Sequence, residues 1–283
     1  MGFLNKLFNK KPDPISISPS EAETSENDEN WVTFLTSISE EDVGSIIVDL
    51  GLETRAPDPE RSILVTISIE LLEKTENSLP TAAERETIDL IELALCKDLV
   101  ERHDAVSPGH LFAFNRLDIF FYVETLTAID QSVSFRMTDF PSYNFTVKDS
   151  IEEDWETYLN LLYPTPIQMQ SISNQQVIAN LLSHGDSLQI ERPVEHWIYF
   201  GTNDARDKFI TAISKMGFEI LNQSFDEETE EPFGLHISRI DRVDPESADE
   251  YTLELWQIAH DCGGLYDGWE TSIINNDESD SLH

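Results

Sequence analysis

The stretch Gly234–Val243, GLHISRIDRV, decides the fold of the second half of the chain, because its apolar and polar residues alternate. Alternation with a period of two predicts a β-strand with one buried face. Two further strands are predicted before it, at His196–Phe200 (HWIYF) and Phe218–Phe225 (FEILNQSF), and one after it, at Leu265–Ile274 (LYDGWETSII). This half of the chain therefore contains four short strands.

Helices separate these strands. One begins at Thr202 or Asn203 and another at Asp244, residue types that cap helix N-termini through a side-chain oxygen. A further helix at 172–183 precedes the first strand. From residue 171 to 283 the order is therefore β-α-β-β-α-β, the split βαβ arrangement of ferredoxin-like folds.

The pattern of residues 30–170 predicts a separate mixed α+β domain, a sandwich of a sheet and helices. An apolar run at 45–52 is followed by strands at 62–71, 110–115, 117–124 and 143–147 and by helices at 80–102, 127–137 and 154–162. Ser107-Pro108-Gly109 is predicted to form a turn. The whole chain is therefore expected to be α+β with two modules, 30–170 and 171–283.

The charge excludes one large class of function. Among 283 residues there are 18 Lys and Arg against 55 Asp and Glu, a formal net charge of −37. A broad nucleic-acid-binding face needs clustered basic residues that displace counterions from phosphates, so direct nucleic-acid binding is not expected. The two cysteines, Cys96 and Cys262, are too few for a disulfide framework and suit a reducing cytoplasm. No apolar run reaches the roughly 18 residues that a membrane span needs.

Residues 1–29 predict a flexible leader. Phe3, Leu4, Leu7 and Phe8 follow helical spacing within residues 1–11, and lysines occupy the other side. This pattern is compatible with a weak peripheral membrane or partner anchor, and equally with a frayed N-terminus. The segment 12–29, rich in proline and acids, is expected to be a linker.

Four segments of the first module are distinctive. They are Ile46–Leu52 (IIVDLGL), the helix that follows Leu79-Pro80-Thr81, the aromatic strand around Phe120–Val123, and Trp155–Pro166 (WETYLNLLYPTP). In these segments the module resembles the family known as domain of unknown function 695. The resemblance implies a bacterial α+β module without an assigned activity.

The second module combines the β-α-β-β-α-β order with Tyr266–Thr271 (YDGWET) in its last strand. In these two features it resembles the regulator of ribonuclease E activity B (RraB) family. The resemblance implies an acidic, cytoplasmic, non-enzymatic protein that uses no cofactor, binds an endoribonuclease and restrains RNA decay. Members of this family also carry a long acidic tail, whereas the residues after Ile274 include only three acidic ones here, Asp277, Glu278 and Asp280.

Two groups of residues are candidates for partner binding. The first is an acidic loop that could attract an Arg/Lys-rich segment or could simply be a solvated surface. The second lies in the last strand, where Trp269 is either a core residue or an exposed anchor. The candidate residues are Asp226, Glu227, Glu228, Glu230, Glu231, Tyr266, Asp267, Trp269 and Glu270.

Two alternatives to a non-enzymatic regulator or adaptor that binds a protein partner remain open. One is an enzyme or small-anion-binding protein whose site lies in the first module or between the modules, with Arg55, Arg61 and Arg116 as the cations that hold an anionic ligand. The other is mimicry of nucleic acid by rows of carboxylates. No catalytic motif is found, Cys96 is expected to be a buried structural thiol, and His260-Asp261-Cys262 diverge too far on a helix to bind one metal ion.

Overall fold

The computed structural model describes residues 29–38, 42–73, 75 and 79–274. The chain divides into two compact units at the peptide between Pro164 and Thr165. The domain boundary expected after residue 170 therefore falls inside a helix that starts at Pro166. The leader segment 1–11, with its possible membrane anchor, lies outside the described residues.

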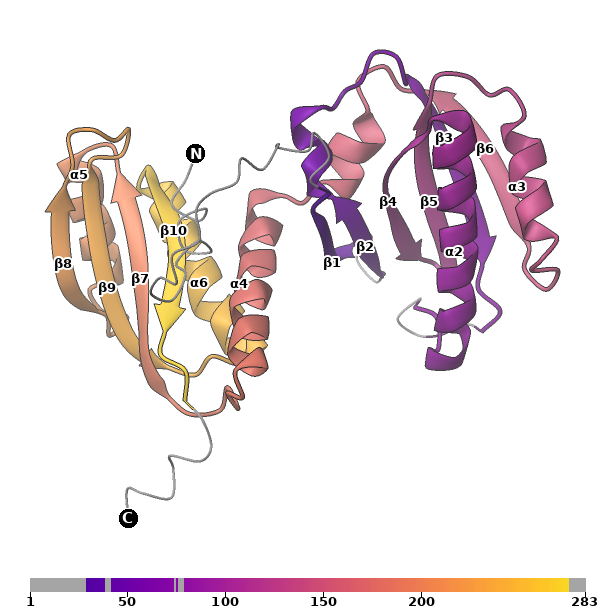
Figure 1. Cartoon of the computed structure of the whole chain (residues 1–283). Coiled ribbons are helices and arrows are strands. Elements are labelled where there is room, and N and C mark those ends of the chain that lie inside the picture. The colour runs from indigo at the N-terminus through magenta and orange to yellow at the C-terminus, as the bar shows by residue number, and fades with distance from the viewer. Residues whose placement is uncertain (1–28, 39–41, 74, 76–78, 275–283) are drawn as a thin grey trace, which may run out of the picture. The chain divides into compact units, whose positions relative to one another are not determined.

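The first unit is built on a sheet of six strands in the order β1-β2-β4-β5-β3-β6, with every neighbouring pair antiparallel. Two α-helices, a 3₁₀ helix and a π-helical turn complete it (Figure 1). The strands are β1 (Trp31–Ser37), β2 (Val43–Asp49), β3 (Ile63–Glu70), β4 (Val106–Ala113), β5 (Arg116–Val123) and β6 (Phe145–Ile151). The helices are η1 (Leu50–Thr54), α2 (Ala82–His103), α3 (Ile129–Met137) and η2 (Thr157–Leu162).

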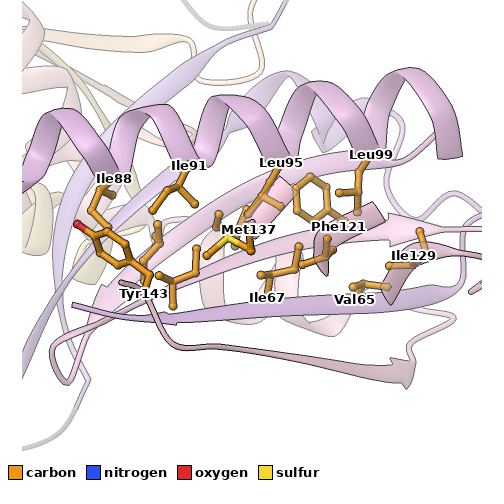
Figure 2. Close-up of a cluster of buried hydrophobic side chains, with 14 of the residues drawn as sticks. Val65, Ile67, Ile88, Ile91, Leu95, Leu99, Phe121, Ile129, Met137 and Tyr143 are labelled. Carbon is orange, nitrogen blue, oxygen red and sulfur yellow. The ribbon is translucent and has the colours of Figure 1, made fainter. Parts of the chain in front are cut away.

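One face of this sheet packs against α2 and α3. The predicted helix positions Ile88, Ile91, Leu95 and Leu99 are fully buried, as their spacing along one helix face requires. Figure 2 shows them above strand residues such as Phe121, with which they form one hydrophobic cluster. Burial of this continuous apolar surface holds α2 on the sheet.

The opposite face packs against the segment that includes η2. The Trp155 ring is stacked on Tyr122 with centroids 3.9 Å apart, and its Nε1 donates to the Arg61 carbonyl at 2.8 Å. The Tyr158 hydroxyl donates to the Asp49 carbonyl at 3.0 Å. Trp155 and Tyr158 therefore cover the second face of the sheet.

Three local predictions for the first unit differ from the structure. β1 was not predicted, because it is an edge strand with an exposed face. The predicted turn at 107–109 lies inside β4, where the register shifts between Val106 and Gly109. Gly109 is required there, since a Cβ would lie 2.3 Å from the Ile47 carbonyl oxygen. The helix predicted over 154–162 is the π-helical η2.

The second unit is ferredoxin-like, as predicted. Its four antiparallel strands lie in the order β10-β7-β9-β8, and three helices pack on one face. The elements are α4 (Pro166–Ser183), β7 (Arg192–Phe200), α5 (Asn203–Ile213), β8 (Glu219–Phe225), β9 (Phe233–Asp241), α6 (Pro245–Asp261) and β10 (Gly264–Thr271). The α+β fold class is thus confirmed for both units.

Candidate functional site

The acidic loop, residues 226–231, is a solvent-exposed turn between β8 and β9. The Asp226 amide donates to the Pro232 carbonyl at 2.9 Å, and the Asp226 carboxylate accepts from the Glu228 amide at 3.1 Å. Four of its carboxylates, those of Asp226, Glu227, Glu228 and Glu230, are exposed and that of Glu231 is half-buried, and none of the five forms a salt bridge within the described parts of the chain. Five negative charges are therefore held together by a short ordered turn and are accessible to a partner.

Two candidate residues of the last strand lie in the core instead. Trp269 is 4% exposed, and its Nε1 donates to Asn174 on α4 at 2.9 Å. Tyr266 is 5% exposed, and its hydroxyl lies 2.8 Å from Nδ1 of His196. Burial lowers the pKa of His196 to about 3, so this imidazole is neutral at physiological pH. Both rings hold β10 against its neighbours and leave little surface for a partner.

Asp267 and Glu270 differ from these aromatic residues. Asp267 lies in a β-bulge, where the pairing of β10 with β7 shifts between Tyr266 and Gly268. Only 7% of Asp267 is exposed, and burial raises the pKa of its carboxyl group. Glu270 is exposed and pairs in register with Glu195 of β7. The last strand thus contributes carboxylates to the site.

The cations considered for an anion site in the first unit have protein partners. Arg61 forms salt bridges with Asp58 and Asp104, and Arg116 with Asp118 at 2.6 Å. Arg55 lines a groove of about 680 Å³ between α2 and the β1–β2 edge, together with acidic and apolar side chains. Four carboxylates, those of Glu29, Asp49, Asp89 and Glu92, also line this groove. Their negative charge would repel an anionic ligand.

The thiol in the same groove is a poor nucleophile. Burial, followed by the charge of Glu92, raises the pKa of Cys96 to about 12, although the Ser107 hydroxyl lies 4.0 Å away. The thiolate is therefore scarce at neutral pH. Its neighbour His110 is buried, with Nδ1 2.7 Å from a carboxylate oxygen of Glu92. This arrangement fits a structural thiol and a structural histidine–carboxylate pair.

The described ranges contain neither a metal-binding cluster nor a membrane-spanning helix. No cluster of three or more His, Cys, Asp or Glu side chains there could hold a metal ion. No helix among those residues is both long and apolar enough to cross a membrane.

The sequence did not single out the residues on the open face of the second sheet, the face opposite α4, α5 and α6. Trp197 of β7 and His236 of β9 pair in register on this face, and their rings are stacked with centroids 4.4 Å apart. His236 Nε2 lies 2.7 Å from a carboxylate oxygen of Glu195. Alternation within HWIYF places every second residue on this face and could have identified Trp197 and Tyr199.

The fold and these surfaces define an acidic α+β protein of two units, the second of which is ferredoxin-like with an exposed acidic loop. Each unit matches one known family model. Residues 171–271 match the family described as Regulator of ribonuclease activity B (RraB). Residues 29–163 match the Family of unknown function (DUF695). Both resemblances inferred from the sequence are confirmed.

Other comparisons add little. No curated protein matches the chain. A solved structure described as an unknown protein from Galdieria sulphuraria aligns with 75% of this chain and 99% of its own, at 9% identity and a TM-score of 0.20. A score this low supports no conclusion about fold or function.

Proposed function

We propose that this protein is a non-enzymatic cytoplasmic regulator that binds an endoribonuclease through its second unit and restrains RNA decay. The observation that carries the proposal is the match of residues 171–271 to a family of ribonuclease regulators. The charge of the chain is consistent with binding to a basic protein segment rather than to RNA.

The acidic loop suggests a mechanism based on charge. Its five carboxylates, four of them exposed, would attract an Arg/Lys-rich segment of the nuclease and increase the rate of association. Basic residues that are bound in this way are no longer available to RNA phosphates. The mechanism needs no bond-making residue, which agrees with the structural roles of Cys96 and His196.

The test measures cleavage of a fluorescent RNA by an endoribonuclease that carries an arginine-rich segment, with and without the full chain. We expect the chain to slow cleavage at low salt and to lose most of this effect above the ionic strength at which the Debye length falls below about 8 Å. Cleavage that stays unchanged at a large excess of the chain would refute the proposal.

A charge-matched pair of variants isolates the loop. The loop variant changes Glu227, Glu228, Glu230 and Glu231 to Gln. The control changes four exposed glutamates of the first unit to Gln, so that the net charge changes equally; these are Glu86, Glu101, Glu124 and Glu153. The loop variant is expected to lose inhibition and the control to retain it. Equal inhibition by both would show that the loop is not a docking element.

A further inference from the structure

The open face of the second sheet combines aromatic rings with carboxylates. In β7, Glu195, Trp197 and Tyr199 alternate with the buried residues of the core, so all three side chains lie on the face without helices. Trp197 is stacked on His236 of the neighbouring strand. The Tyr199 ring lies against Gly234, where a Cβ would come within 3.4 Å of Cε1. The two rings are therefore held in place by the strands below them.

Two carboxylates beside these rings, Glu195 and Glu270, repel each other. Glu195 and Glu270 are directly opposite in the β7–β10 register, and like charges in such a pair repel. Among the two glutamates, the His236 imidazole is paired with Glu195, from the β9 side of that residue, and no ion pair to Glu270 is found among the described residues. A cation between the strands would relieve the repulsion between the two glutamates.

Asp267 is a second, independent observation. Its side chain is more than nine-tenths buried in the bulge, yet no hydrogen bond or ion pair to its carboxylate is found among the described residues. Burial, and after it the nearby charge of Asp267, raises the pKa of the Tyr199 phenol. The Asp267 oxygens are not among the fully buried unpartnered atoms of the described residues, so the carboxylate remains accessible to a cationic ligand at the surface.

Lysine and arginine are absent from the strand residues of this face. Arg192 and Arg239 are the only Lys or Arg residues in β7, β8, β9 and β10, and both lie on the opposite, helix-covered face, whereas His236 lies on the open face. Arg239 lies over the Phe218 ring there, and Arg192 is bound to Asp186. Single-stranded RNA stacks on aromatic rings only where basic residues neutralise its phosphates, so this face does not suit RNA.

We propose that the open face of the second sheet binds an arginine-rich segment of the partner protein, with guanidinium groups stacked on the two aromatic rings and paired with the surrounding carboxylates. A planar guanidinium can stack on a ring and donate to a carboxylate at the same time, which an ammonium group does less well. Trp197 and Tyr199 are two residues apart in a strand, about 6.6 Å, so an extended Arg-X-Arg sequence matches their spacing.

The acidic loop is continuous with this face. Phe225, the residue before the loop, pairs with Phe233, and the next residue of β9, Gly234, pairs with Tyr199. A segment attracted by the loop would thus meet the Tyr199 end of the face first. The inference rests on the proposed function, for which it names the docking surface and the chemistry of the partner segment.

The test measures affinity by fluorescence anisotropy with the full chain and three labelled probes: a peptide of alternating arginine and serine, the same peptide with lysine, and a single-stranded RNA of similar length. We expect the arginine peptide to bind several-fold tighter than the lysine peptide and the RNA not to bind. Tighter binding of RNA, or equal binding of the two peptides, would overturn the assignment of an arginine site.

Variants locate the site. Trp197→Leu is expected to weaken the arginine peptide about fivefold, as loss of a cation–π contact predicts, and Glu270→Gln about threefold. The control Glu254→Gln removes an exposed charge from α6, on the helix side, and should have no effect. Equal affinities for Glu270→Gln and Glu254→Gln would overturn the proposal even if Trp197→Leu proved unstable.

The two proposals can fail separately. If the face variants lose the peptide but the chain inhibits no ribonuclease, the arginine site is supported and the proposed function fails. If inhibition persists undiminished in Glu270→Gln and Trp197→Leu, the ribonuclease proposal stands and the docking face is wrong.

Discussion

The buried ion pair between Asp186 and Arg192 should control the stability of the second unit, and Asp186→Asn tests this. The Asp186 carboxylate receives two guanidinium donors, one at 2.9 Å, and also accepts from the amides of Leu188 at 2.7 Å and Ile274 at 2.8 Å. The Arg192 guanidinium further donates to the Ser272 carbonyl at 3.0 Å. The pair thus joins the start of β7 to the chain that follows β10.

The magnitude follows from burial of both partners. The side chains of Asp186 and Arg192 are 0% and 1% exposed, so Asp186→Asn leaves a buried guanidinium without its counter-ion. Removal of one partner of a buried pair costs about 3–5 kcal/mol. A matched control is Asp241→Asn, whose salt bridge to Arg239 is partly exposed, and we expect that variant to lose about 1 kcal/mol or less.

The same pair predicts an acid transition. Hydrogen bonds from Arg192 lower the pKa of Asp186 from 3.8 to about 2 in the folded protein. Because the folded pKa is depressed, the stabilisation is fully present above pH 4 and is lost as the pH falls from about 4 to about 2. The fall in the pKa of Asp186 from 3.8 to about 2 corresponds to about 2 kcal/mol of the free energy of unfolding.

Urea unfolding followed by tryptophan fluorescence, together with hydrogen exchange of the β7 and β10 amides, measures both effects. Faster hydrogen exchange of these amides shows that the second unit is the one that loses stability. Equal destabilisation by Asp186→Asn and Asp241→Asn, or the same pH dependence between pH 4 and 2 in the Asp186→Asn variant as in the unmodified chain, would refute the reasoning.

Three other predictions concern single contacts. Trp155→Ala should lower the free energy of unfolding of the first unit by about 3–5 kcal/mol, because the 1% exposed ring is lost from its stack on Tyr122; a loss below about 1 kcal/mol in urea unfolding would contradict the packing. Cys96 should react with a thiol reagent at pH 7 far more slowly than it does in urea, and labelling at equal rates would show that its thiol is neither buried nor shifted in pKa. Thr165→Ala should cost about 1 kcal/mol, since the Thr165 side chain and Gln168 form a capping box at the start of α4; unchanged exchange protection in α4 would argue against that cap.

The sequence alone determined the class of fold and the two families. Strand and helix periodicity predicted the β-α-β-β-α-β order, because one buried face per strand and per helix leaves a direct pattern in the chain. Short specific segments such as Tyr266–Thr271 predicted the families. The acidic composition argued against an RNA-binding surface, since charge needs no coordinates to be counted.

The tertiary structure alone decided which residues share a surface. The bulge at Asp267 shifts the register of β10, and only strand pairing shows that Glu270 lies opposite Glu195. Trp269 and Trp197 look alike in the sequence, yet one packs in the core and the other lies on the open face. The physical reason is that periodicity specifies two faces for a strand, whereas contacts between distant strands and helices decide which face is buried.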